Sequence, residues 1–185
     1  GGLAAFLKPS GYTGPEGAGG REPGANGLAF DAKGRLVLCQ HGDRRISRLE
    51  DGRFVPVVER FEGKRFNSPN DLVIAADGAV YFTDPPYGLT GTFDDPGREI
   101  GWNGVYRVAP DGRVSVLVKD LKAPNGIGLS PDGRTLYVGQ SDGARPVVMA
   151  YDLAKDGTVA SGRVFFDTLP RRVNRPGVPA GLRVA

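Results

Sequence analysis

The stretch NGLAFDAKGRLVL, residues 26–38, decides the fold, because the chain repeats it with variations. Its echoes are NDLVIAADGAVYF at 70–82 and NGIGLSPDGRTLYV at 125–138, and a shorter copy, AGLRVA, starts at 180. The starts are 44, 55 and 55 residues apart, in or near the range of four-stranded propeller blades. The repeat therefore predicts an all-β propeller.

Each unit contains four short runs that are rich in β-forming residues and that end in turn residues. The runs cover 28–30, 36–40, 46–50 and 54–61 in the first unit, 72–75, 80–84, 105–109 and 114–121 in the second, and 127–130, 135–140, 147–153 and 164–169 in the third. We therefore expect three complete blades of four strands, at about 26–61, 70–121 and 125–169. Parts of two other blades are expected at 1–10 and 180–185, with residues 3–7 as an outer strand.

Composition excludes several other classes of protein. Glycine and proline number 29 and 15, about a quarter of the chain and roughly twice their usual share. The longest run without either residue, 113–123, is too short for a membrane-spanning helix or a coiled coil. A net charge of +3 without a basic stripe argues against nucleic acid as a partner. The densest basic group is expected to be a solvated loop and consists of Arg171, Arg172 and Arg175.

The single cysteine, Cys39, excludes an internal disulfide and a zinc site made of several cysteines. Because Cys39 lies in an apolar run, we expect a small buried side chain. The sequence shows no secretory signal and leaves the compartment open. Three blades alone would expose apolar faces and unpaired strand edges. We therefore expect the 185 residues to belong to a longer polypeptide, with closure of two half-rings in a dimer as the alternative.

Alternating strand directions place the starts of the repeats on one face of the sheets. Because the first strands surround a propeller's axis, Asn26, Asn70, Asn125 and Ala180 are expected to meet near its channel mouth. The loops between second and third strands, at 40–44, 84–103 and 140–145, should form the rim of that mouth. The other face carries only tight hairpins, whose glycines and acidic residues serve the turns.

The rim loops contain further candidates. His41 is the only histidine, and it is a candidate substrate contact or proton shuttle. Asp84 and Tyr87 begin the long loop of the second unit, which consecutive prolines stiffen, and they are candidate substrate contacts. Trp102 and Phe93 are expected to pack that loop against the sheet.

Five motifs gather on this face: CQHGDRR at 39–45, NSPND at 67–71, TDPPYG at 83–88, PNG at 124–126 and VPAG at 178–181. Together they resemble the senescence marker protein/gluconolactonase/luciferin-regenerating-enzyme-like family, and in particular its bacterial gluconolactonase-like members. The resemblance covers the chain from about residue 11 onward. It implies a six-bladed propeller that holds one divalent metal at the channel mouth, usually calcium, with zinc or magnesium as alternatives. It also implies hydrolysis of sugar lactones or related esters.

The resemblance also implies a metal-ligand set: a first-blade Glu, the Asn of Pro-Asn-Gly and an Asp one blade later. Asn125 matches the Pro-Asn-Gly ligand, and Asn70 matches an asparagine that binds metal or substrate. The Glu is expected upstream of this chain, since Glu16 falls in a glycine-rich linker, and Ala180 stands where the family has Asp. Amide oxygens without carboxylates give weak calcium sites, so Asn70 and Asn125 alone are not expected to hold calcium.

Neighbouring polar residues are interpreted differently. Asn26 precedes a glycine at a strand entry, where asparagine often satisfies the backbone of a turn, so it is read as structural. Asp71 should point away from Asn70, because side chains alternate along a strand, and it is expected to hold a loop.

Two functional interpretations follow. In the first, the full protein is a metal-dependent hydrolase of a small sugar lactone, and the 185-residue chain alone is inactive because it lacks both family carboxylates. In the alternative, the propeller has lost the metal-binding acid at position 180 and binds a ligand or partner without catalysis. A third possibility is a scaffold fragment assembled with another chain.

Overall fold

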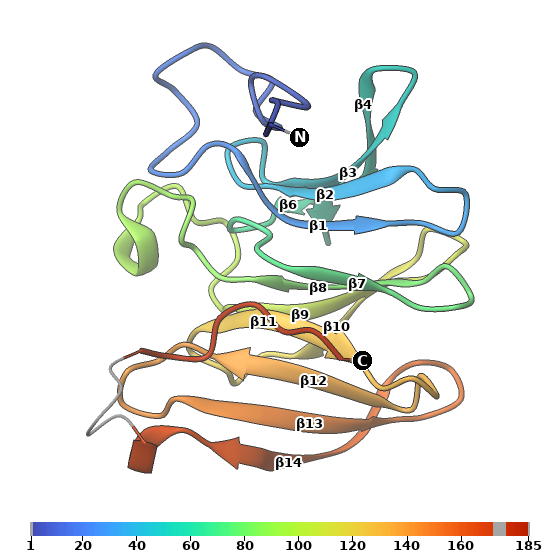
Figure 1. Ribbon diagram of the computed structural model, residues 1–185. Coiled ribbons are helices and arrows are strands. Elements are labelled where there is room, and N and C mark those ends of the chain that lie inside the picture. Colours follow the sequence, from blue (N-terminus) through green and yellow to red (C-terminus); the bar gives the residue numbers. More distant parts are fainter. Residues whose placement is uncertain (1, 172–176, 185) are drawn as a thin grey trace.

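The computed structural model describes residues 2–171 and 177–184, which form three four-stranded antiparallel sheets and one two-stranded hairpin. Figure 1 shows the sheets following one another in chain order, with their first strands, β1, β7 and β11, gathered near the middle of the view. None of the helices among these residues is long and apolar enough to span a membrane. Arg172 and Arg175 of the expected basic loop lie outside the described residues.

Each four-stranded sheet is a simple up-and-down meander, as the four runs per repeat predict. The strands of the first sheet are β1 (Ala25–Phe30), β2 (Leu36–Gln40), β3 (Arg45–Glu50) and β4 (Arg53–Val58). Those of the second are β7 (Leu72–Ile74), β8 (Val80–Asp84), β9 (Gly104–Val108) and β10 (Val114–Val118). Those of the third are β11 (Pro124–Leu129), β12 (Thr135–Gln140), β13 (Val147–Leu153) and β14 (Val159–Asp167).

Several strand predictions were wrong in detail. The run 54–61 does not form one strand: β4 ends at Val58, and the next residues form a separate hairpin of β5 (Arg60–Phe61) and β6 (Lys64–Arg65), which turns at Glu62 and Gly63 with positive φ. Residues 3–7 are not a strand, and their apolar side chains are mostly exposed. Residues 180–184 lie beside β11 without forming a strand (Figure 1). Two short 3-10 turns complete the elements: η1 (Thr92–Asp94) and η2 (Leu169–Arg171).

The core consists of two apolar layers, one on each side of the second sheet. Strand β8 contributes to both, because its side chains alternate: Phe82 packs between the first and second sheets, and Tyr81 packs between the second and third. Phe66 contacts Phe82 edge to face, with ring centroids 5.1 Å apart. Cys39 is fully buried in the first layer, as its apolar run predicts.

The starts of the first strands are hydrogen-bonded to neighbouring sheets, through the backbone in one case and through a side chain in the other. The Gly27 amide donates to the Asn70 carbonyl at 2.7 Å, and the Thr83 hydroxyl donates to the Asn125 carbonyl at 2.6 Å. A Cβ on Gly27 would lie 2.6 Å from the Cα of Asp71, a distance that real Cβ atoms do not reach. Glycine is therefore required where the second sheet crosses β1.

The long loop of the second sheet is fixed by a buried polar cluster. The backbone N–H of Asn67 donates to Oδ2 of Asp84 at 2.8 Å, and the Arg98 guanidinium donates to the side-chain oxygen of Asn103 at 2.9 Å. Asp84 is fully buried, and its Oδ1 has no hydrogen-bond partner among the described residues. Burial is the main cause that raises the pKa of Asp84 to about 7, and it outweighs the hydrogen bonds and the charges of Arg44 and Arg98.

The contact at Gly27 leads to a stability prediction. Gly27→Ala should lower the free energy of unfolding by about 2 kcal/mol, because the added methyl group overlaps backbone atoms that cannot move independently. Urea unfolding monitored by tryptophan fluorescence measures the change. Gly101→Ala is the matched control, since a Cβ at Gly101 would meet no atom within 4 Å. Equal stability of the two variants would contradict the close approach.

The buried carboxyl of Asp84 leads to a prediction about pH. Below about pH 4 the group is neutral in both the folded and the unfolded chain. Between pH 4 and 7 the unfolded chain ionises first, so the free energy of unfolding falls by up to about 4 kcal/mol through this group. Asp84→Asn should remove that loss, whereas the surface change Asp120→Asn should retain it. Urea midpoints at pH 4 to 8 test this, and parallel pH profiles of wild type and Asp84→Asn would contradict it.

Candidate functional site

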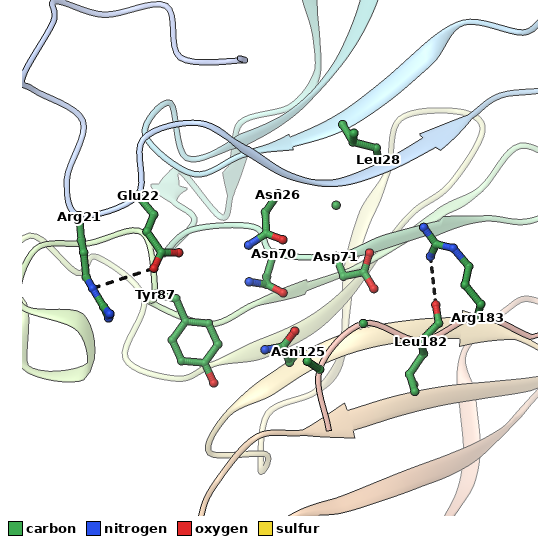
Figure 2. Close-up of a pocket in the computed structure, with 13 residues that line it drawn as sticks. Arg21, Glu22, Asn26, Leu28, Asn70, Asp71, Tyr87, Asn125, Leu182 and Arg183 are labelled. Carbon is green, nitrogen blue, oxygen red and sulfur yellow. Dashed lines mark hydrogen bonds and ion pairs between the residues drawn. The ribbon is translucent and has the colours of Figure 1, made fainter. Parts of the chain in front are cut away.

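A cavity of about 750 Å³ opens where the first strands of the three sheets begin. Figure 2 shows one asparagine amide from each sheet along it: Asn26, Asn70 and Asn125. The hydrogen bonds from Gly27 to the Asn70 carbonyl and from the Thr83 hydroxyl to the Asn125 carbonyl bring these repeat positions together. The other lining residues are Arg21, Glu22, Gly27, Leu28, Asp71, Tyr87 and residues 180–183.

The structure thus brings Asn70, Asn125 and Ala180 to one cavity, as the repeat predicts. Asn26, which we read as a turn residue, also lines it. Asn26 occupies the same position in its repeat as Asn70 and Asn125, and this equivalence indicated that it would lie at the cavity. The roles of these residues in binding stay predictions.

His41 lies behind the lining and does not reach the cavity surface. It is 1% exposed, and its Nε2 is 3.4 Å from Nδ2 of Asn70. On its other side, Nδ1 of the ring is 3.9 Å from the Glu22 carboxylate. Burial lowers the pKa of His41, although Glu22 partly opposes this shift. His41 therefore meets the cavity through two lining residues, Asn70 and Glu22.

Asp71 holds neighbouring segments, as expected, but it faces the same cavity as Asn70. Its carboxylate accepts hydrogen bonds from the amides of Leu72 at 3.0 Å and Ile127 at 3.1 Å, and from the backbone of Leu182. Burial raises the pKa of Asp71 despite these bonds. The prediction of opposite directions was wrong because regular strand geometry starts only at Leu72, after both residues.

Tyr87 lines the cavity, whereas Asp84 does not. The Tyr87 hydroxyl forms hydrogen bonds with the side chains of Ser141 and Asn125, and burial raises its pKa. The Tyr87 ring meets Phe93 edge to face at 5.9 Å. Asp84 is enclosed by the polar cluster beneath the loop, so the structure does not support direct contact with a substrate. Phe93 thus packs against Tyr87 within the loop.

Trp102 also packs the loop, through the first core layer and a 3.0 Å hydrogen bond from its indole N–H to the hydroxyl of Tyr106. Sequence reasoning missed three charged lining residues: Arg21, Glu22 and Arg183. Glu22 and Arg21 lie in the irregular segment just before β1, where no periodicity singles out a residue. The only signal for them was their closeness to Asn26 in the chain.

The described residues do not by themselves form a calcium site. Within 2–171 and 177–184, no three His, Cys, Asp or Glu side chains are grouped so that they could hold a metal. Asp71 already accepts backbone hydrogen bonds through both oxygens, and Ala180 offers no side-chain donor. The amide oxygens of Asn70 and Asn125 lack the negative charge that calcium sites normally supply.

Comparison with known proteins gives this cavity a context. Residues 15–184 match the model of the SMP-30/Gluconolactonase/LRE-like region. The chain is 46% identical over 164 residues to a gluconolactonase of Zymomonas mobilis, covering 86% of this chain and 46% of that protein. It is 27% identical over 157 residues to a pentonolactonase of Haloferax volcanii, covering 85% and 44%.

Solved structures agree in fold. A gluconolactonase of Xanthomonas campestris, 40% identical, superposes with a TM-score of 0.68 over 77% of this chain and 48% of its own. A putative gluconolactonase, 33% identical, gives a TM-score of 0.72 over 88% and 54%. The chain thus spans about half the length of these relatives. It belongs to the SMP-30/gluconolactonase/LRE-like family.

Proposed function

We propose that the full protein hydrolyses small sugar lactones, and that this chain supplies part of the substrate cavity. The observation that carries the proposal is the row of three asparagine amides in one cavity. It occurs in a chain that is 46% identical to a gluconolactonase. Side-chain amides both donate and accept hydrogen bonds, which suits the hydroxyl groups and the carbonyl of a sugar lactone.

The reaction adds water to the lactone carbonyl carbon and breaks the ring C–O bond, which leaves a hydroxy acid. In this chain, Asn26, Asn70 and Asn125 would orient the ring through its oxygens. The hydroxyl of Tyr87 adds a fourth polar group at the same wall. Among the lining carboxylates, that of Asp71 already accepts hydrogen bonds from backbone amides, whereas that of Glu22 is half-exposed at the rim of the cavity.

The metal dependence implied by the family resemblance remains part of the proposal, with Asn125 and Asn70 as two of the ligands. Since the described residues do not complete a calcium site, no step of the reaction is assigned to a metal here. The alternative, a noncatalytic propeller, has one specific observation in its favour: the methyl group of Ala180 lines the cavity where the family has an acid.

Removing an amide should impair the reaction. In the full protein, Asn125→Ala should lower kcat/KM for glucono-1,5-lactone by at least about 100-fold, because a hydrogen-bonding group at the reacting ring is lost. Arg113→Ala, on an exposed hairpin, should leave it unchanged. Acid release at constant pH measures both. Activity of the Asn125→Ala protein equal to wild type would refute this assignment, and absence of hydrolysis in the wild-type full protein would favour the noncatalytic alternative.

The 185-residue chain alone is expected to show no measurable hydrolysis, but position 180 can be tested in it. Ala180→Asp should tighten calcium binding by about tenfold or more, since a charged oxygen is added beside Asn70 and Asn125. Ala180→Asn adds an oxygen without charge and should give a smaller gain. Calorimetric titration compares the three proteins. Equal affinity of the Ala and Asp forms would show that residue 180 is not a ligand position.

A further inference from the structure

The loop after the second strand of each sheet contacts the start of the next repeat along the chain. His41 follows β2 and meets Asn70, and Tyr87 follows β8 and bonds to the side chain of Asn125. Ser141 follows β12, and its hydroxyl donates to the carbonyl of Pro179. The cavity amides thus lie in front of a second layer of side chains that comes from the preceding sheet.

We infer that His41 is a positioning residue that turns the side-chain oxygen of Asn70 toward the cavity. The inference rests on the proposed function and deepens it. A side-chain amide presents either its oxygen or its NH₂ group in a given direction, and the two ends differ completely in what they bind. His41, the neighbour behind Asn70, therefore decides whether the Asn70 side chain presents its oxygen or its NH₂ group to the cavity.

The environment of the His41 ring determines its tautomer. Nδ1 faces the Glu22 carboxylate, whose oxygen lies 3.9 Å away and can only accept a hydrogen bond. The ring proton therefore belongs on Nδ1, which leaves Nε2 with a lone pair. Only the NH₂ group of Asn70 can donate to that lone pair, so its oxygen points the other way, into the cavity.

Both His41 and the backbone of Asn70 are held in place. The backbone N–H of His41 donates to the Gly24 carbonyl at 3.2 Å. A Cβ on Gly88 would lie 2.7 Å from the Cβ of His41, so the loop that contains Gly88 packs closely against His41. The backbone N–H of Asn70 donates to the Thr83 carbonyl at 2.8 Å. The main freedom left to Asn70 is rotation of its side-chain amide about the last side-chain bond. That rotation is what His41 fixes.

Nitrogen-15 NMR of the 185-residue chain tests the orientation directly. We expect His41 to be protonated on Nδ1, with a scalar coupling across the hydrogen bond between Nδ2 of Asn70 and Nε2 of His41. A proton on Nε2 would overturn the inference, since the ring would then donate to the Asn70 oxygen and turn the NH₂ group into the cavity. This readout does not depend on any activity.

Two variants test the consequence for binding. His41→Leu should weaken binding of glucono-1,5-lactone about tenfold, whereas His41→Gln, which retains an acceptor, should stay within about threefold of wild type. Thermal unfolding of both variants verifies that they are folded. Equal weakening in two folded variants would overturn the positioning role. If wild type binds no lactone, the proposed function of the chain fails, while the NMR result still decides the orientation of Asn70.

Discussion

The close approach of consecutive first strands is the constraint on which the rest of the structure depends. Where the second sheet crosses β1, its backbone lies so near that no side chain fits at Gly27, and Gly126 is in the same position against residue 180. The glycine that follows asparagine in the first and third repeats is thus a packing requirement. In these two repeats the asparagine before the glycine, Asn26 or Asn125, lines the cavity. One steric constraint therefore sets how closely the neighbouring segments approach beside the cavity.

The second repeat breaks this rule, and the exception is informative. It has Asp71 where the other repeats have glycine, and the carboxylate reaches over to the amide of Ile127 in the next sheet. A charged acceptor is a stronger partner for backbone amides than a neutral one. It is held between the second and third sheets at the base of the cavity, where burial raises its pKa. The first two sheets meet by direct backbone contact, whereas the second and third meet through this carboxylate and through the hydroxyl of Thr83.

The repeat made the sheets predictable, because each hairpin turn and each apolar run is a local feature of the sequence. It also predicted that Asn70, Asn125 and position 180 share one cavity, since equivalent positions in equivalent units must lie on the same face. The errors occurred where contacts between distant segments decide the outcome. Asp84 looked like a rim residue, but the loop after it folds back and buries it under Arg98 and Asn103. Residues 3–7 have the composition of a strand but pair with no strand among the described residues.

The same distinction explains why the lining could be predicted better than the layer behind it. A lining position follows from the repeat, but its partner comes from a loop whose length differs between the units. His41 follows its strand directly, whereas Tyr87 lies three residues after Asp84 at the start of the long loop. The three amides are alike in sequence, yet Asn70 faces an imidazole and Asn125 faces a phenol. A row of equivalent residues thereby becomes a cavity with distinct walls, which allows it to distinguish the ends of an asymmetric ligand.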